Sequence, residues 1–236
     1  MKALLPEAVY QQLRIQLIAG EILPGNRLDY SRLAAQMGVS TTPVREAMAR
    51  LASEGLVTLV PRAGAMVRVL KNDEFKHLYG VREALESHAI ALAASRIAAA
   101  EIRHLAMLQE AMERQEERLG GTRHPLTVGD GLSGFLRCDF AFHMTIIEAS
   151  GNPRLTSIAS ENAALARLFD RGQKERALAS LREINDSHRE IVLAISDRDS
   201  VRARGLMRHH LRREMELTLT VQAQPSCVSC LAAVHR

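Results

Sequence analysis

Residues 38–57 of the chain read GVSTTPVREAMARLASEGLV, and the spacing of this stretch decides how the first third of the sequence folds. Ser40 is a good N-cap residue, and Pro43 falls in the first helical turn, where its missing N–H costs nothing. The helix that follows ends at Gly55 and has one apolar face, which consists of Val44, Ala47, Met48 and Leu51. The opposite face is polar and includes Arg45, so the helix is predicted to keep one side in solvent.

The segments on either side of this helix complete a small domain. Apolar spacing predicts helices before it and strands after it, over residues 6–19, 30–37, 56–60 and 65–69. Asp29 can cap the second helix, Gly38 can end it, and a turn that contains Gly64 joins the two strands. Three helices followed by a hairpin describe a winged helix-turn-helix domain, which we predict for residues 1–70.

The polar start of the third helix has the chemistry needed to read DNA. Its hydroxyl side chains can reach phosphates, and Arg45 can donate to O6 and N7 of guanine in the major groove. Residues 1–70 carry eight Lys and Arg against five Asp and Glu, whereas the other residues are nearly balanced at 23 against 22. A basic module beside a neutral one is typical of a polyanion-binding domain. Periodicity alone leaves open a plain three-helix scaffold with an exposed arginine.

Residues 7–69 resemble the DNA-binding domain of GntR-family bacterial transcription regulators. The resemblance rests on the segment IAGEILPGNRLDYSRLAAQMGVSTTPVREAMARLASEGLVTLVPRAGAMV. It implies contacts to DNA by Ser40, Thr42, Arg45 and, at the tip of the wing, Gly64. The chain departs from the family pattern at Thr41, where the family usually has arginine. The loss of that cation is expected to remove one DNA contact and to shift the preferred operator.

From about residue 71 the strand signals stop, and helical spacing continues to about residue 221. Helices are predicted over residues 73–98, 100–119, 134–149, 153–172, 175–182, 184–197 and 199–221. They describe an all-helical bundle, which we predict as a second domain over residues 71–221. Residues 222–236 lose the helical spacing and contain Pro225, so we expect a disordered tail there.

Four polar residues fall on otherwise apolar helix faces of this second domain. Asp139 and His143, four residues apart, share a face with phenylalanines of one helix. His188 lies among isoleucines of a second helix, and His210 among leucines of a third. A buried carboxylate is costly unless it is paired or bound to a metal, and one carboxylate with three imidazoles suits Zn, Ni, Mn or Fe better than Ca or Mg. Spacing alone leaves open a buried Asp139–His143 salt bridge and hydrogen-bonded core histidines.

The bundle resembles the FCD effector-binding domain of the FadR-like branch of the same regulators. The matching segments are CDFAFHMTIIEASGNPRL, SHREIVLAISDRD and GLMRHHL. The resemblance implies a cavity for small organic carboxylates and a divalent metal held by Asp139, His143, His188 and His210. Arg82 can grip such a carboxylate with two hydrogen bonds. The alternative for Arg82 is an ion pair with Glu86, one helical turn away.

The composition excludes several other classes of protein. The chain has 236 residues, of which 47% are hydrophobic and 25% charged, and these values exclude a disordered or fibrous protein. Charged residues interrupt every long apolar run, so no membrane-spanning segment is expected. The first apolar run is too short for a signal peptide and three Cys make no disulfide framework, so we expect a cytoplasmic protein. Cys227 and Cys230 lie in the tail without enough partners for a zinc site.

Together these features predict a DNA-binding transcription regulator that is not an enzyme, and by family resemblance a repressor. We expect it to bind a double-stranded operator as a homodimer, because one recognition helix reads too few bases. A small organic carboxylate at the metal-containing pocket would control the operator affinity. One alternative is a metal-dependent enzyme that uses the Asp139 and histidine cluster, with Glu148 or Glu190 as the nearest candidate base. The other is a constitutive DNA binder whose metal is structural.

Overall fold

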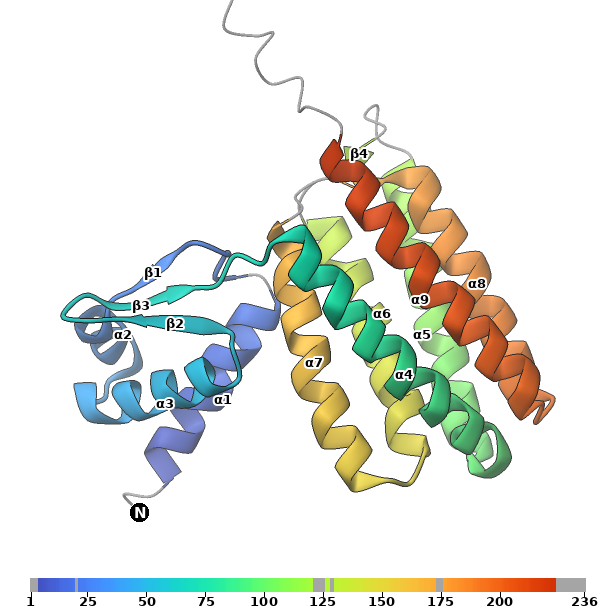
Figure 1. Ribbon diagram of the computed structural model, residues 1–236, viewed down its shortest axis with the longest axis horizontal. Helices are drawn as coiled ribbons and strands as arrows, with labels where there is room; N and C mark the ends of the chain where they lie inside the picture. The colour runs from blue at the N-terminus through green and yellow to red at the C-terminus, as the bar shows by residue number, and fades with distance from the viewer. Residues whose placement is uncertain (1–3, 20, 121–125, 128–129, 173–175, 224–236) are drawn as a thin grey trace, which may run out of the picture.

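The computed structural model describes residues 4–19, 21–120, 126–127, 130–172 and 176–223. Figure 1 shows a small unit of helices and a sheet beside a bundle of longer helices. The small unit contains α1 (Leu4–Ala19), β1 (Arg27–Leu28), α2 (Tyr30–Met37), α3 (Thr41–Ser53), β2 (Val57–Val60) and β3 (Gly64–Val67). The bundle contains α4 (Asn72–Arg96), α5 (Ala99–Gly120), α6 (Asp130–Ala149), α7 (Pro153–Gly172), α8 (Leu178–Ser196) and α9 (Ser200–Ala223), with the short strands β4 (Leu126–Thr127) and β5 (Arg176–Ala177). The prediction of a winged helix-turn-helix followed by a helical bundle is confirmed.

The helix-turn-helix forms where the sequence places its caps. Asp29 Oδ1 accepts a hydrogen bond from the backbone N–H of Arg32 at 2.8 Å, and Gly38 ends α2 with a φ of 65°. Ser40 occupies the N-cap position of α3, but its side chain makes no capping hydrogen bond. The predicted apolar face of α3 is buried, with exposed fractions of 0–2% at Val44, Ala47, Met48 and Leu51. This face holds α3 against α1 and leaves its polar side in solvent.

The wing is a three-stranded sheet rather than the predicted two-stranded hairpin. β2 and β3 pair antiparallel, with Val57 opposite Val67, and β1 adds a third strand beside β3. A strand of two residues is too short to produce a periodic signal, which is why the sequence does not predict it. Gly64 starts β3 with a φ of 96°, and a Cβ at this position would lie 2.2 Å from the carbonyl oxygen of Leu28. The third strand therefore requires glycine here.

The bundle has one main apolar core, in which the fully buried side chains include Phe75, Phe135 and Phe142. The two helices predicted over 175–182 and 184–197 form a single helix, α8. No Gly or Pro interrupts residues 178–196, so nothing in the backbone ends a helix near residue 183. α9 runs to Ala223, and the rest of the predicted tail lies outside the described residues. Among the helices that the structure describes, none is long and apolar enough to cross a membrane.

α7 connects the bundle to the winged-helix unit. Arg14 of α1 donates from Nη2 to Oγ and to the carbonyl oxygen of Ser160, at 3.3 and 3.4 Å. Ala164 is 1% exposed and packs with Leu165 into the apolar core of the winged-helix unit. Arg14 also pairs with Glu54 at the end of α3, at 3.3 Å. α7 of the bundle and the C-terminal end of α3 are therefore linked through Arg14 of α1.

Replacement of Gly64 by alanine is expected to destabilise the winged-helix unit, because the new Cβ would displace β1. We expect the free energy of unfolding to fall by about 2–4 kcal/mol. Gly38→Ala is the matched control: Gly38 also has a positive φ, but no atom lies within 4 Å of where its Cβ would be. Its expected cost is about 1 kcal/mol. Equal losses for the two variants in urea denaturation would contradict the steric argument.

Candidate functional site

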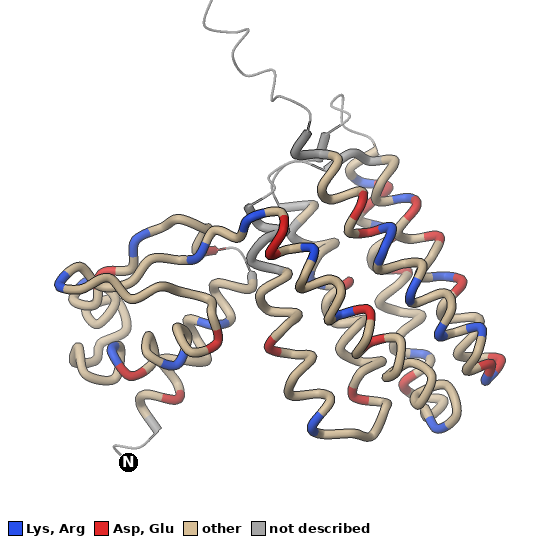
Figure 2. Tube along the Cα trace, viewed as in Figure 1, with Lys and Arg blue, Asp and Glu red and all other residues tan. Residues whose placement is uncertain are grey.

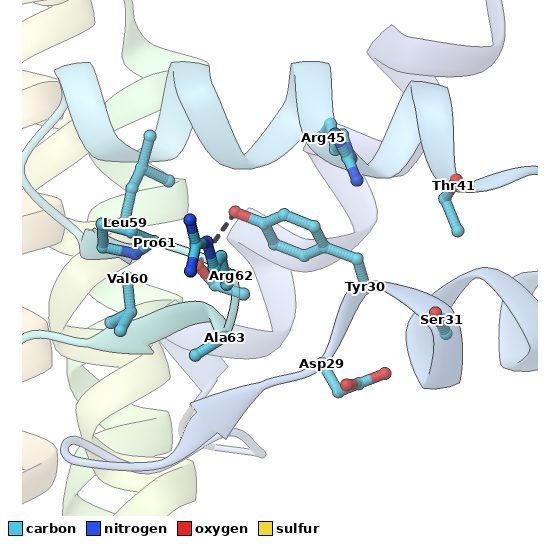
Figure 3. A pocket seen from close by; sticks show the side chains of 11 residues that line it. Asp29, Tyr30, Ser31, Thr41, Arg45, Leu59, Val60, Pro61, Arg62 and Ala63 are labelled. Carbon is cyan, nitrogen blue, oxygen red and sulfur yellow. Dashed lines mark hydrogen bonds between the residues drawn. The ribbon is translucent and has the colours of Figure 1, made fainter.

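A hollow of about 540 Å³ lies between the first turn of α3, the start of α2 and the turn that joins β2 to β3. Figure 3 shows Thr41 and Arg45 on its α3 side and Arg62 on its wing side. The Tyr30 hydroxyl donates to the carbonyl oxygen of Gly64 at 3.1 Å, and the Arg45 guanidinium carbon lies 6.0 Å from the centre of the Tyr30 ring. Recognition helix and wing thus border one concave surface.

The four residues predicted to contact DNA lie on both sides of the first turn of α3. Arg45 and Gly64 border the hollow beside the wing, whereas Ser40 and Thr42 border a second hollow of about 940 Å³ beside the start of α1. Ser40, Thr42 and Arg45 are all exposed. The polar end of α3 is therefore open to solvent on both flanks.

The arginines of the winged-helix unit fall into two groups. Three form ion pairs with acidic residues: Arg14 with Glu54, Arg50 with Glu7 and Arg68 with Glu74. Four others form no ion pair with any described residue: Arg27, Arg32, Arg45 and Arg62. These four lie on or next to the elements that border the wing-side hollow, and Figure 2 shows the basic positions of this unit. Guanidinium groups that lack acidic partners attract a polyanion.

In the bundle, three helices bring the four predicted metal ligands together. α6 carries Asp139 and His143, α8 carries His188 and α9 carries His210, and all four side chains are 0–3% exposed. One ligand atom from each lies within 4.8 Å of the others. Asp139 Oδ1 is 3.8 Å from His143 Nε2 and 3.4 Å from His188 Nε2. The Nε2 atoms of His143 and His210 are 3.2 Å apart.

These donor atoms fit one divalent transition-metal ion. Atoms bound at about 2.1 Å from an ion are about 3.0 Å apart at right angles and about 3.4 Å apart at tetrahedral angles, close to the observed separations. Among the described residues, the buried side chains with a formal charge are three carboxylates and one guanidinium, from Glu86, Asp139, Glu214 and Arg82. Their sum is −2 when the three imidazoles are neutral, and a divalent cation balances it.

Glu86 and Ser187, which the sequence does not predict at this centre, contact two of the histidines at Nδ1, the ring nitrogen away from the cluster. Glu86 Oε2 lies 2.6 Å from His143 Nδ1, and Ser187 Oγ lies 2.6 Å from His210 Nδ1. Helical spacing offers Glu86 only as a partner of Arg82, because His143 is 57 positions away. Ser187 gives no signal either, since it faces a histidine of another helix.

Arg82 forms the ion pair with Glu86 that the sequence offers as one of its two roles, with Nε 2.7 Å from Oε1. Its guanidinium is buried, Nη1 lies 3.4 Å from Glu214 Oε2, and Cζ lies 4.6 Å from the centre of the Tyr79 ring. Glu214 follows His210 by one helical turn on α9, a spacing that could have revealed it. Arg82 thus joins α4 to α9 beside the ligand cluster, the set of four predicted metal ligands Asp139, His143, His188 and His210.

Burial and neighbouring charges shift the pKa values of Glu86 and His143 in opposite directions. Burial alone raises the pKa of Glu86, but the charges of Arg82 and His143 and their hydrogen bonds lower it to about 2. Burial lowers the pKa of His143, but Glu86 outweighs burial, so that pKa is raised. For His210 burial dominates, and with the charge of His143 it lowers the pKa to about 4. Neighbouring imidazoles at this centre therefore differ in basicity.

The other polar candidates lie away from this centre. Glu148 and Glu190 are exposed on α6 and α8. Cys138 is half-buried and packs against the bundle core, whereas Cys227 and Cys230 lie outside the described residues. Figure 2 shows acidic and basic positions on α8 and α9. Several arginines of α9 form ion pairs with neighbouring helices: Arg208 and Arg212 with Glu83 of α4, and Arg213 with Glu183 of α8.

Replacement of Arg82 by methionine is expected to destabilise the bundle, because Glu86 and Glu214 would lose their buried guanidinium partner. We expect the free energy of unfolding to fall by about 3–5 kcal/mol at neutral pH. Arg212→Met is the matched control, because Arg212 also pairs with a glutamate, Glu83, but is exposed. That variant is expected to unfold like the wild type. Similar losses for both in urea denaturation would contradict a buried network.

Models of two protein families match the two units. Residues 5–67 match the bacterial regulatory proteins of the gntR family, and residues 77–213 match the FCD domain. A helix-turn-helix transcriptional regulator from an unstable DNA locus of Streptomyces ambofaciens is 31% identical over 205 residues, which cover 86% of this chain and 80% of the relative. The transcriptional repressor GlaR of Escherichia coli is 27% identical over 222 residues, which cover 86% of this chain and 90% of GlaR.

The fold has a counterpart among solved structures. Escherichia coli McbR/YncC superposes with a TM-score of 0.80 at 24% identity, over 93% of this chain and 99% of that one. At this identity the likeness concerns the fold alone. The matched families and the relatives are transcription regulators rather than enzymes. The chain belongs to the GntR family of bacterial transcription regulators, and the helical unit behind its DNA-binding domain is an FCD domain.

Proposed function

We propose that this regulator is a repressor whose operator affinity is controlled by a small organic carboxylate at a divalent transition-metal centre. The observation that carries the proposal is the buried set of one carboxylate and three imidazoles, from Asp139, His143, His188 and His210. This donor set suits Zn, Ni, Mn or Fe. The regulator acts as a homodimer in the cytoplasm, and its similarity to the repressor GlaR supports the sign of the regulation.

In this proposal the first turn of α3 enters the major groove of the operator. Arg45 is exposed and has no acidic partner among the described residues, so its guanidinium is available to O6 and N7 of guanine. Ser40 and Thr42 reach phosphates on the other flank, and the wing at Gly64 approaches the minor groove. Thr41 supplies no cation, so each protomer makes one ionic contact fewer than the family pattern implies. A second protomer is needed because one helix reads too few base pairs.

The effector carboxylate binds beside the ligand cluster. A bound metal supplies coordination positions that a carboxylate oxygen can take. The chain contributes Arg82, whose guanidinium has five N–H donors and can bind a further carboxylate while it keeps its 3.4 Å contact with Glu214. Glu86 keeps the Nε side of the same guanidinium in place at 2.7 Å.

An effector changes DNA binding only if it prefers one placement of the two winged-helix domains over another. The contacts that can transmit this preference start on α4, the helix that carries Arg82. Asn162 of α7 donates from Nδ2 to the carbonyl oxygen of Leu78 on α4 at 3.1 Å. Two residues earlier on the same helix, Ser160 of α7 accepts hydrogen bonds from Arg14 of the DNA-binding domain. A shift of α4 would therefore reach the recognition helix through α7 and α1.

One observation favours the alternative in which the metal is structural and DNA binding is constitutive. The four ligands are 0–3% exposed, as expected of a metal that holds helices together and exchanges nothing with solvent. A rise in melting temperature with a carboxylate is expected of a sensing function and not of a purely structural metal.

Arg45→Ala is expected to lower the preference for the operator over other DNA about 10- to 100-fold per half-site, because a bidentate contact to guanine is lost. Metal binding should be unchanged. A preferred site is first selected from a random duplex library with the wild-type protein. Affinities for this site and for a scrambled duplex are then compared at one salt concentration. Arg50→Ala is the control on the same helix, because Arg50 faces Glu7 and the Tyr10 ring. An Arg45 variant that discriminates like the wild type would show that α3 is not the reading element.

A carboxylate effector is expected to raise the melting temperature of the metal-loaded protein by about 2–8 °C at saturating concentration and to leave the chelator-treated protein unchanged. The measurement is a thermal-shift screen of mono-, di- and tricarboxylates on zinc-loaded and EDTA-treated protein. His188→Ala should remove the response, because it deletes a ligand of the centre. If chelation lowers the melting temperature but no carboxylate raises it, the metal is structural. If chelation has no effect and no metal copurifies, the four residues are a polar core network.

A further inference from the structure

We infer that Glu86 and Ser187 are positioning residues that fix which ring nitrogen of His143 and His210 carries the proton, so that both Nε2 lone pairs face the metal centre. Neither residue is a proposed ligand, and each contacts its histidine on the side away from the cluster. The inference rests on the proposed metal centre and names the side chains that prepare the centre for a cation.

Ser187 determines the state of His210 through the single proton of its hydroxyl group. Ser187 Oγ lies 2.7 Å from the carbonyl oxygen of Ile184 and 2.6 Å from His210 Nδ1. The carbonyl oxygen can only accept, so the hydroxyl proton is donated to Ile184. Toward His210 the hydroxyl oxygen is then an acceptor, and Nδ1 must carry the ring proton. A neutral imidazole with its proton on Nδ1 has its lone pair on Nε2.

Glu86 has the same effect on His143 through its charge. Arg82 donates to Glu86 Oε1 at 2.7 Å and keeps the carboxylate ionised, so Oε2 is an acceptor only. At 2.6 Å from Oε2, the Nδ1 atom of His143 must donate. When this ring is neutral, as a metal ligand must be, its lone pair is also on Nε2, on the side of the cluster.

With both rings neutral, two acceptor nitrogens face each other across the centre. The Nε2 atoms of His143 and His210 are 3.2 Å apart, and Asp139 Oδ1 is 3.8 Å from the first of them. Lone pairs and a carboxylate oxygen at these separations repel one another unless a proton or a metal cation lies among them. The fold thus holds a set of ligand atoms that a cation stabilises. Glu86 and Ser187, which orient these atoms, are not themselves members of the set.

Glu86 and Ser187 should differ in how strongly they affect the affinity of the centre for zinc. Glu86 is charged, so it makes His143 a stronger electron donor as well as orienting it. Ser187 is neutral and only orients His210. We expect Glu86→Gln to weaken zinc binding about 100-fold and Ser187→Ala about 10-fold, the two ends of the range typical of such partners.

The test is the zinc dissociation constant of the full chain and its variants, measured by competition with a chromophoric chelator at one pH. Asp139→Asn, which alters a ligand, serves as the reference for a damaged centre. Glu83→Gln is the control for Glu86→Gln, because Glu83 lies on the same helix but pairs only with exposed arginines. Ser196→Ala is the control for Ser187→Ala, because Ser196 of α8 also donates to a backbone carbonyl oxygen, that of Val192 at 2.8 Å, but is exposed. Ser187→Thr retains the hydroxyl group and should retain the affinity.

A second measurement separates positioning from general damage to the fold. Long-range proton–nitrogen NMR spectra of the metal-free protein near neutral pH report which nitrogen of His210 carries the proton. Wild type should show the proton on Nδ1, and Ser187→Ala should shift it toward Nε2. A wild-type His210 protonated on Nε2 would overturn the inference, even if Glu86→Gln is too unstable to measure.

The outcomes of the zinc titration distinguish this inference from the function on which it rests. If wild type binds zinc, Asp139→Asn does not, and the Glu86 and Ser187 variants bind like wild type, the positioning role is wrong and the metal centre stands. If wild type itself binds no zinc or other divalent transition metal, the proposed metal centre is wrong and the positioning role falls with it.

Discussion

An ionised glutamate in the middle of a helical core needs donors on both of its oxygens, and the packing of the FCD domain satisfies this need for Glu86. One oxygen accepts from Arg82 of the same helix, and the other contacts His143 of α6. Arg82 in turn reaches Glu214 of α9. Removal of any one partner would leave a buried charge without compensation, which is far more costly than an unpaired charge at the surface. The helices around the ligand cluster are therefore fixed relative to one another by charge as well as by apolar packing.

The pairing of charges also separates the roles of the two domains. Along the outer helices of the FCD domain, arginines lie against glutamates, so much of this surface is locally neutral. Around the recognition helix and the wing, four arginines have no acidic partner among the described residues. A formal net charge of only +4 therefore understates the positive field around α3 and the wing. If the same number of basic side chains were spread over the surface and paired with acidic ones, no face of the molecule would have a stronger positive field than another.

Features carried by neighbours in the sequence were predictable, and features made by distant segments were not. The cap at Asp29, the buried face of α3 and the pair Asp139 and His143 all follow from helical spacing. The contact between Glu86 and His143 does not, because periodicity shows which face of a helix is buried and not which helix covers it. The two-residue strand β1 was missed for lack of length. The division of α8 was wrong because a polar residue within a helix does not end it without a glycine or proline.

Ala164 and Leu165 belong to the FCD domain by sequence but lie in the apolar core of the DNA-binding domain. A winged helix that borrows part of its interior from the adjoining domain is not an interchangeable cassette. Grafted onto a foreign sensory domain, it would expose apolar surface that α7 normally covers, and it would lose the hydrogen bonds between Arg14 and Ser160. Productive recombination with other regulators is thus restricted to domains that present the same two apolar side chains at the same place.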